Sequence, residues 1–548
     1  MAEQLPCSLA IAVAAAAAII GPLLTMVLAA AVTSAGAGES GSNTKDTRKE
    51  AKGNRSKNEG PPSVPFYYVP MKQDSHGSLS ADPPFGDLLK SLDKYRLDTS
   101  SFLASLTRQH EVARRSEWIM YGDRGDAPDN PLLAARYRDK IGRVAECLEN
   151  DYLVIEELMQ PFDVTIGLTS SDDEVVEDAL DVPDRYACRD EDDEDVEEKR
   201  YTSMPGRRRG NDDDNDGSSY GSAAQIITHI VRDWTQQGQG IRSSLYSWCV
   251  DMFDKYHIKD SKQRELPVLV PGSGLGRLAY EISIAGYAVE ANDVSISMVA
   301  VANKILNGHV AAHSRKLHPF CSDFLVNEVD SDSRYDSVAF PDVNVSPGGR
   351  LSCTLGDFIT TYGSSRRKNQ YGAVVTCFFI DTATNIFEYL AVINSSLCSG
   401  GLWINVGPVQ WHRNALVQPS GNELKMLIEG FGFEILTWSA DTGEGVNYRH
   451  DEDHKSRYTK TEAYLPIRFV DRKRSDRGDR RQDIVHVIQE LREMTAADQR
   501  ISTAYASSIA KGKTEADKSN DENDLGGGFV VVEQEAEGDV GVTIEELS

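Results

Sequence analysis

A glycine-rich loop between two apolar runs constrains the fold of this chain more than any other feature of its sequence. The run Val268–Val270 predicts a short buried strand. Three glycines follow it at alternating positions, namely Gly272, Gly274 and Gly276. Because glycine has no Cβ, the backbone can turn tightly here and approach a ligand closely. Strand and loop together are typical of the start of a nucleotide-binding βαβ unit.

The segment after the loop completes that unit. Apolar residues at helical spacing predict a helix from Leu275 to about Ala285, and Tyr287–Ala291 predicts a second buried strand. Asp293 follows this strand, and a carboxylate roughly 20 residues beyond the glycines is suited to accept hydrogen bonds from both ribose hydroxyls. The order of strand, glycines, helix, strand and acid indicates a nucleotide site far more specifically than the glycines alone.

Beyond Asp293 the chain alternates helices with buried strands. Helices are expected at Ser295–Leu306, Asn385–Leu397 and Asn422–Glu429. Strands are expected at Ala373–Phe379, Leu402–Val406, Phe433–Leu436 and Ile467–Val470. This alternation predicts an α/β domain with a parallel sheet that helices cover on both faces.

The remaining sequence divides into helical and polar parts. Apolar residues at steps of three and four predict a helical N-terminal region over residues 83–165, and a further helix begins at Ala223. Three segments are too polar or too charged to bury a core and are expected to be disordered, namely a linker at 41–82, an acidic insert at 166–222 and most of an acidic tail at 472–548. Within the tail, Ile484–Met494 predicts one amphipathic helix.

Residues 1–40 contain the almost wholly apolar stretch Cys7–Ala35, which is long enough to cross ~30 Å of hydrocarbon. Three interpretations stay open: a single membrane anchor, a cleaved targeting peptide, or a dispensable alanine-rich extension. Basic residues cluster downstream between Lys45 and Lys57, so an anchor would leave the catalytic body in the cytoplasm.

Charge and cysteine content narrow the function classes. Asp and Glu outnumber Lys and Arg by 85 to 58, which gives a net charge of −27 and argues against a nucleic-acid partner. The eight cysteines form no C-x-x-C pair and no cluster with histidines. Neither a metal site nor a disulfide framework is therefore expected, and reduced thiols fit a cytosolic setting.

The G-x-G-x-G spacing is one that Rossmann-like methyltransferases use, where the loop packs against the methionine portion of S-adenosylmethionine. Several longer strings make the chain resemble the carnosine N-methyltransferase family, namely Val231–Trp234, Leu269–Ala279, Gly356–Phe358, Thr376–Asn385, Gly400–Pro408 and His412. The resemblance covers roughly residues 85–165 and 223–470. It implies a seven-stranded Rossmann-like class I methyltransferase sheet within residues 223–471, preceded by the helical region.

The resemblance also implies which residues hold S-adenosylmethionine. Arg232 would reach the methionine carboxylate, since a guanidinium fork suits a carboxylate. Three residues earlier the family has a cofactor-contacting Gln, whereas this chain has His229. Gly272 and Gly274 of the loop would line the cofactor.

Four further positions match cofactor-binding positions of the family. Asp293 would hold the ribose, where the family has a longer Glu. Asp357 and Phe358 would bracket the adenine by hydrogen bond and stacking, and Cys377 would lie beside the cofactor. Core packing is the competing explanation for Phe358 and Cys377.

Asp381, His412 and Tyr464 match the substrate-binding positions of the family. An imidazole must attack the sulfonium methyl with a free lone pair, so its other nitrogen must carry the proton. A carboxylate at Asp381 would accept that N–H and fix the tautomer. His412 and Tyr464 would orient the ring and the peptide, although Glu462 stands where the family has another aromatic residue.

The function implied by the resemblance is methyl transfer to an imidazole nitrogen of carnosine or a related histidine peptide, giving anserine. A protein histidine or another small molecule stays open as the acceptor. An NAD-dependent oxidoreductase is a second alternative, although it needs a glycine where Arg277 stands. A membrane-tethered interaction scaffold is a third. The sequence does not decide whether the chain forms a homodimer.

Overall fold

The computed structural model describes residues 63–70, 83–121, 133–166, 220–256, 265–321, 327–346, 350–448, 457–474 and 486–497. The apolar stretch Cys7–Ala35, the acidic insert up to residue 219 and most of the acidic tail lie outside these residues. Within the described ranges, no helix is both long enough and apolar enough to cross a membrane.

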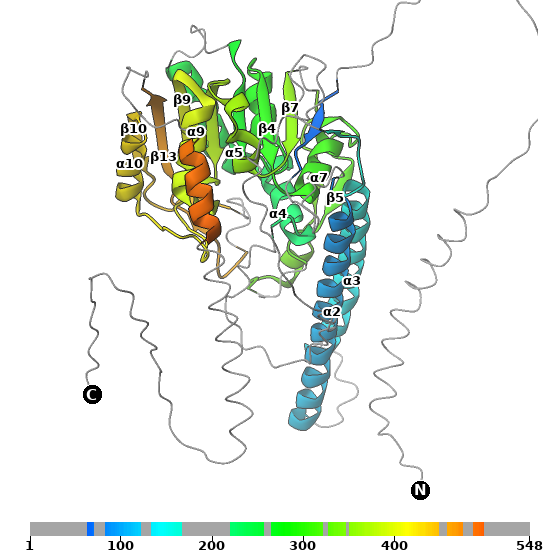
Figure 1. Cartoon of the computed structure of the whole chain (residues 1–548). Coiled ribbons are helices and arrows are strands. Elements are labelled where there is room, and N and C mark those ends of the chain that lie inside the picture. The colour runs from blue at the N-terminus through cyan, green and yellow to red at the C-terminus, as the bar shows by residue number, and fades with distance from the viewer. Residues whose placement is uncertain are drawn as a thin grey trace, which may run out of the picture. The chain divides into compact units, whose positions relative to one another are not determined.

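The central element is a nine-stranded sheet (Figure 1). Its strands run in the order β10 (Phe433–Ala440), β13 (Ile467–Lys473), β9 (Leu397–Gly407), β8 (Tyr371–Cys377), β3 (Val268–Pro271), β4 (Val289–Asp293), β7 (Leu351–Leu355), β1 (Phe66–Tyr68) and β2 (Thr165–Ile166). The strands from β9 to β2 are mutually parallel, whereas β13 is antiparallel to both of its neighbours. The predicted α/β class and Rossmann-like sheet are confirmed, with seven strands from β10 to β7 and two more at one edge.

The two extra strands correct the sequence analysis. β1 lies inside the segment 41–82 that was predicted to be a disordered linker, so that prediction is wrong at Phe66–Tyr68. Phe66 and Tyr68 are buried, and Phe66 pairs in register with Cys353 of β7. Three residues are too few for a hydrophobic period to appear, and the pairing with β7 supplies the stability that the local sequence lacks.

Helices surround the sheet. Their bounds are α2 (Gly86–Tyr121), α3 (Leu133–Leu158), α4 (Ala223–Trp234), α5 (Gln239–Lys255), α6 (Arg277–Ile284), α7 (Ile296–Leu306), α8 (Phe358–Tyr362), α9 (Ile386–Ser396) and α10 (Gly421–Gly430). Figure 1 shows α2 and α3 side by side as a long pair. Residues 486–497 form one further helix, which confirms the helix predicted at Ile484–Met494 within the acidic tail.

Alternating side chains of β3 bury both faces of the sheet. Val268 and Val270 belong to a core formed with α4, α5, α6 and α7, whereas Leu269 belongs to a second core formed with α8, α9 and α10. This is the period of two expected of a strand, and all three side chains are buried because helices lie on both faces. The prediction of a doubly covered sheet is confirmed.

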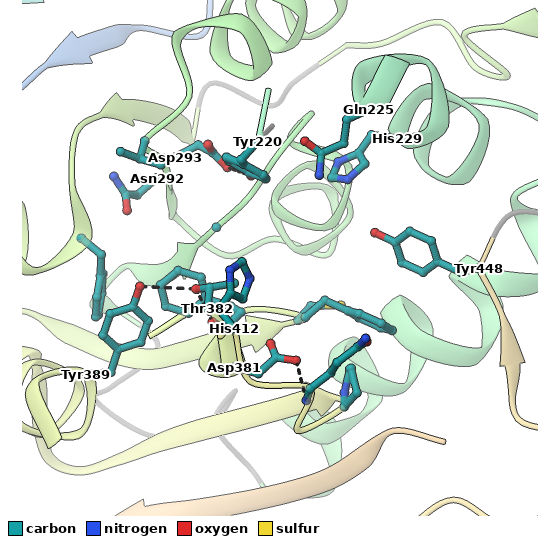
Figure 2. Close-up of a pocket in the computed structure, with 18 of the residues that line it drawn as sticks. Tyr220, Gln225, His229, Asn292, Asp293, Asp381, Thr382, Tyr389, His412 and Tyr448 are labelled. Carbon is teal, nitrogen blue, oxygen red and sulfur yellow. Dashed lines mark hydrogen bonds between the residues drawn. The ribbon is translucent and has the colours of Figure 1, made fainter. Parts of the chain in front are cut away.

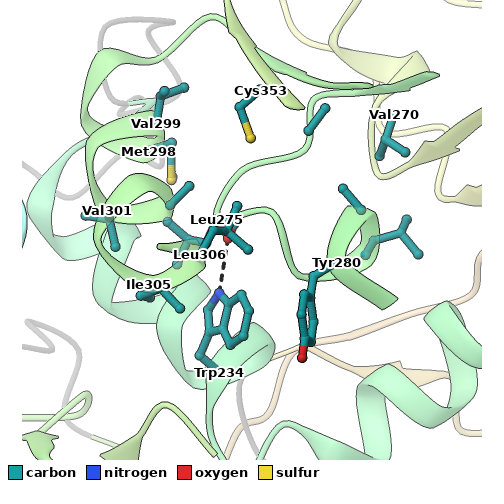
Figure 3. Close-up of a cluster of buried hydrophobic side chains, with 14 of the residues drawn as sticks. Trp234, Val270, Leu275, Tyr280, Met298, Val299, Val301, Ile305, Leu306 and Cys353 are labelled. Carbon is teal, nitrogen blue, oxygen red and sulfur yellow. Dashed lines mark hydrogen bonds between the residues drawn. The ribbon is translucent and has the colours of Figure 1, made fainter. Parts of the chain in front are cut away.

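The first of these cores fixes the glycine loop in place. Trp234, at the end of α4, is fully buried and donates from Nε1 to the carbonyl of Leu275 at 3.1 Å (Figure 3). Leu306 at the end of α7 packs against Gly276, where a Cβ would lie only 2.9 Å from its Cδ1. The loop is therefore held from both sides by helices that are distant in sequence.

Candidate functional site

A cavity of about 740 Å³ lies at the carboxyl ends of the parallel strands. This is the edge at which open α/β sheets bind their ligands, and the volume is typical of small-molecule sites. All site residues predicted from the sequence except Gly274 line it, namely His229, Arg232, Gly272, Asp293, Asp357, Phe358, Cys377, Asp381, His412 and Tyr464. They come from eight separate segments of the chain, and the fold brings them together.

Gly272 is the residue of the glycine loop that lines the cavity. Gly272 has φ +63°, and a Cβ there would lie 2.4 Å from Cδ2 of Phe379, so only glycine fits this position without displacing an aromatic ring. Gly274 is the exception among the predicted residues. Its N–H donates to Oδ2 of Asp293 at 2.8 Å, and it acts on the site by positioning that carboxylate.

We expect Gly272→Ala to abolish measurable binding of S-adenosylhomocysteine, because the new Cβ pushes Phe379 into the cavity. Gly443→Ala is the matched control: Gly443 also has a positive φ, of +92°, yet no atom lies within 4 Å of a Cβ built there. Calorimetric titration of both variants separates steric blockage from backbone strain. Equal binding by Gly272→Ala and wild type would contradict this account of the loop.

Asp293 is the most heavily hydrogen-bonded carboxylate of the site. Oδ2 accepts from the Tyr220 hydroxyl and the Gly274 N–H, both at 2.8 Å, and Oδ1 accepts from the Ser295 N–H at 2.9 Å. Burial raises the pKa of Asp293, and these donors oppose that rise. In Figure 2 Tyr220 and Asp293 lie together. The side chain is thus fixed before any ligand arrives.

One face of α4 supplies a second wall. Gln225, Thr228, His229 and Arg232 fall at helical spacing and all line the cavity. The Arg232 guanidinium donates to both carboxylate oxygens of Asp233, at 2.6 and 3.0 Å, and to the Tyr448 hydroxyl. Burial, assisted by the Arg232 charge, lowers the pKa of His229 to about 3, so this imidazole is neutral.

The adenine-binding end predicted at Asp357 and Phe358 is aromatic. Asp357 caps α8, since its carboxylate accepts from the Thr360 N–H at 2.8 Å. Phe358 is buried and meets Phe379 and Tyr389 edge to face, at 5.3 and 5.2 Å between ring centroids. Phe379 and Tyr389 stack on each other at 4.9 Å. These rings form an apolar aromatic wall against which a purine can pack.

The substrate end predicted at Asp381 lies apart from Asp293 (Figure 2). Asp381 stands in the short turn η6 (Ile380–Thr382) after β8 and accepts from the Gln410 N–H at 3.1 Å. It is 7% exposed, and burial raises its pKa to about 6. His412 lies near it in Figure 2, and both line the cavity. The group is a buried carboxylate that is ionised at neutral pH and has accepting capacity to spare.

Sequence reasoning missed several lining residues, among them Tyr220, Gln225, Tyr389, Gln410 and Tyr448. Gln225 could have been found, because it precedes His229 by four residues on a predicted helix. The others lie on turns or on a helix face packed toward the sheet ends, and no periodicity in the sequence indicates their direction.

Comparisons with known proteins identify a family model and several relatives that this chain resembles. Residues 212–473 match the family model described as carnosine N-methyltransferase. Among curated relatives, carnosine N-methyltransferase of Mus musculus is 34% identical over 38% of this chain and 54% of its own length. That of Schizosaccharomyces pombe is 32% identical over 39% of this chain and 62% of its own. The Drosophila melanogaster protein "Carnosine N-methyltransferase unmet" is 28% identical over 56% and 65%.

This chain therefore spans between about half and two thirds of the length of these relatives. Among solved structures, magnesium protoporphyrin IX methyltransferase from Synechocystis is 13% identical, with a TM-score of 0.29, over 47% of this chain and 97% of that one.

The resemblance inferred from the sequence motifs is confirmed over residues 212–473. The oxidoreductase alternative gains no support, since Arg277 begins α6 and is paired with Asp342 at 2.6 Å.

Proposed function

We propose that this chain, a member of the carnosine N-methyltransferase family over residues 212–473, transfers a methyl group from S-adenosylmethionine to an imidazole nitrogen of carnosine or a related histidine peptide. The observation that carries the proposal is the single cavity lined both by the cofactor set around Asp293 and by the Asp381–His412 pair. A methyl donor and an imidazole can thus meet in one cavity.

The residues present fit the cofactor. Asp293 offers a fixed carboxylate for the ribose hydroxyls, Arg232 lies on the wall where a carboxylate would bind, and the Phe358 wall suits adenine. Gly272 leaves the space that any side chain would fill. When bound, S-adenosylmethionine supplies a methyl group on a sulfonium, which is already a reactive donor.

The contribution of the protein is then mainly orientation. Asp381 would accept the N–H of one imidazole nitrogen, which leaves the lone pair of the other nitrogen free to attack. Asp293, Arg232 and Gly272 would hold the cofactor so that it could supply its methyl group to that lone pair. His412 and Tyr464 would hold the ring in line with that methyl group. Proximity and alignment of this kind can supply most of the rate enhancement.

The proposal is tested by incubating the full chain with methyl-labelled S-adenosylmethionine and a panel of acceptors. Carnosine should be labelled on an imidazole nitrogen to give anserine or its ring isomer. β-Alanyl-alanine, which lacks the imidazole, and anserine, whose ring already carries a methyl group, serve as controls. Absence of label in every imidazole compound, or equal label in β-alanyl-alanine, would overturn the proposal.

We expect Asp293→Ala to weaken binding of S-adenosylhomocysteine at least tenfold. A ribose hydrogen bond to a charged acceptor is lost, worth roughly 1.5–3 kcal/mol, and Oδ1, which accepts from Ser295, is the oxygen with capacity left for it. Asp98→Ala, which removes an exposed carboxylate on α2, is the control and should bind normally. Calorimetric affinities decide the matter, with circular dichroism to check that the fold persists. An Asp293→Ala variant with wild-type affinity would remove Asp293 from the cofactor site.

A cytoplasmic catalytic domain and a small peptide substrate belong to the same proposal. The predicted membrane attachment and homodimer gain no support from the comparisons or from the described residues. The stretch Cys7–Ala35, on which the anchor depends, lies outside those residues.

A further inference from the structure

Acid, imidazole and thiol side chains form a buried cluster where α3 lies beside β5 (Arg315–Leu317; Figure 1). Asp151 of α3 is fully buried, and His318 directly follows β5. The Asp151 carboxylate accepts from the backbone N–H of His318 at 3.0 Å, and its Oδ1 accepts from Nδ1 of the imidazole, also at 3.0 Å. Neither residue lines the candidate site, so this pair has no part in the proposed methyl transfer.

His318 also has a thiol partner. Cys147 lies one turn before Asp151 on α3 and forms a hydrogen bond with the His318 side chain. Because Asp151 occupies Nδ1, Nε2 is the nitrogen left for this thiol. The hydrogen bond with Asp151, assisted by Cys147, raises the pKa of His318 to about 10, so the imidazole is protonated at neutral pH. An imidazolium held by a carboxylate beside a thiol is an arrangement that activates cysteine nucleophiles.

A second thiol and an unpartnered hydroxyl belong to the same cluster. Cys321 is fully buried, packs in one hydrophobic cluster with Cys147, and places Sγ 3.7 Å from Oδ2 of Asp151. Tyr95 of α2 is 4% exposed and interacts electrostatically with Asp151 and Cys321. Its hydroxyl has no hydrogen-bond partner among the described residues. A buried donor left without an acceptor suits an oxygen atom that is added to the cluster later.

The cluster reaches solvent through its imidazole. The side chain of His318 is 18% exposed, whereas Cys147 is 8% exposed. Access of this kind favours a reactant of about the size of a water molecule over a bulky one.

Two simpler explanations account for less of the cluster. A structural tether between α3 and β5 needs only the Asp151–His318 pair, and it leaves two thiols and the Tyr95 hydroxyl unexplained. A metal centre is the other explanation. Within the described ranges, however, no group of three or more His, Cys, Asp and Glu side chains is arranged to hold a metal ion.

We propose that Cys147 is a reactive thiol, which a hydroperoxide oxidises to a sulfenic acid and which Cys321 then captures in a disulfide. With hydrogen peroxide, the Cys147 thiolate attacks one oxygen, so that an S–O bond forms and the O–O bond breaks. The leaving hydroxide takes a proton from His318 and becomes water. Cys321 then loses its proton and attacks the Cys147 sulfur, so that an S–S bond forms and the S–O bond breaks. That proton leaves with the second hydroxide as water. Two thiols are oxidised, and one peroxide is reduced to two waters.

The first test compares two thiols within the full wild-type chain. Cys398 is more exposed than Cys147, so exposure alone would make Cys398 react first. We expect the opposite: in brief treatment with hydrogen peroxide, Cys147 should be oxidised at least about tenfold faster than Cys398. Peptide mass mapping should find Cys147 joined to Cys321 by a disulfide that dithiothreitol cleaves. Faster oxidation of Cys398, or pairing of Cys147 with any other cysteine, would overturn the proposal.

His318→Asn tests the source of the reactivity. Its amide can still donate to Asp151, but the cation is lost, so oxidation of Cys147 should slow at least about tenfold while that of Cys398 stays the same. His313→Asn is the matched control, because it removes an exposed histidine of the same segment. Its φ of +56° is one that asparagine tolerates. An unchanged rate in His318→Asn, with the fold intact by circular dichroism, would show that the imidazole does not activate the thiol.

Cys321→Ser tests the capture step. No disulfide can form in this variant, so the sulfenic acid should persist on Cys147, where dimedone traps it as a thioether that mass mapping locates. In the wild type the same treatment should leave little adduct. Absence of the adduct in Cys321→Ser, or equal adduct in both chains, would contradict the proposal. The wild-type comparison of Cys147 with Cys398 decides the matter if either variant fails to fold.

Discussion

Asp381→Asn is expected to lower turnover with carnosine by at least ~100-fold, equivalent to about 2.7 kcal/mol of transition-state stabilisation. The variant keeps the shape of the side chain and loses the negative charge, so its amide can donate where the carboxylate must accept. The imidazole then favours the tautomer whose attacking nitrogen carries the proton. Binding of S-adenosylhomocysteine should be unchanged, because Asp381 lies apart from Asp293 (Figure 2).

The pH profile provides a sharper check on this role. Burial raises the pKa of Asp381 to about 6, so its carboxylate is lost as the pH falls through 6. The imidazole of free carnosine protonates near pH 6.5. Below both values, log kcat/KM of the wild type should fall with a slope approaching two, and that of Asp381→Asn with a slope of one.

Asp98→Asn, which changes an exposed carboxylate on α2, should retain both the turnover and the slope of the wild type. Near-normal turnover of Asp381→Asn on every histidine compound would mean that another group orients the ring. A slope of two in that variant would show that the second titrating group is not Asp381.

Much of the sheet could be predicted because its strands carry their own signal. Val268, Leu269 and Val270 are apolar in succession, which is typical of a strand buried on both faces. Phe66–Tyr68 carried no such signal, since its burial depends on pairing with β7, almost 290 residues away in the sequence. Local patterns therefore identified the central strands and missed the edge that distant contacts create.

The residues of the candidate site likewise fall into two groups: those that local sequence strings identify and those that only tertiary packing brings to the cavity. Residues within recognisable strings, such as Arg232 and Asp381, are assigned by the resemblance, and the fold brings them to one cavity. Tyr220 and Tyr448 belong to turns whose directions are set by tertiary packing, so no local pattern indicates that they contact Asp293 and Arg232.

A buried carboxyl far from this chemistry should dominate the pH dependence of stability. Asp471, in β13, is fully buried between Trp403 of β9 and Ile435 of β10, and neither of its side-chain oxygens has a hydrogen-bond partner among the described residues. Burial, together with the charge of Glu429, raises its pKa to about 8. The folded chain therefore keeps this proton at pH values where the unfolded chain, with an ordinary Asp, has lost it.

This difference in bound protons decides whether the free energy of unfolding rises or falls with pH. Between about pH 4 and about pH 8 the folded state binds one more proton at Asp471 than the unfolded state, so the free energy of unfolding falls by about 1.4 kcal/mol per pH unit. Below this window both states are protonated, and above it both are ionised, so the contribution becomes flat. Asp471→Asn cannot ionise and should lack this decline.

The difference in stability between Asp471→Asn and the wild type should therefore grow with pH. Relative to its value at pH 5, the stability of Asp471→Asn at pH 8 should exceed that of the wild type by roughly 4 kcal/mol. Urea denaturation of both chains at several pH values, followed by tryptophan fluorescence, measures the difference. Glu434→Gln on the neighbouring strand β10 is the control, because the carboxylate of Glu434 is exposed to solvent. Parallel profiles for the wild type and Asp471→Asn would mean that Asp471 is ionised in the folded chain, where burial without a partner makes the charge most costly.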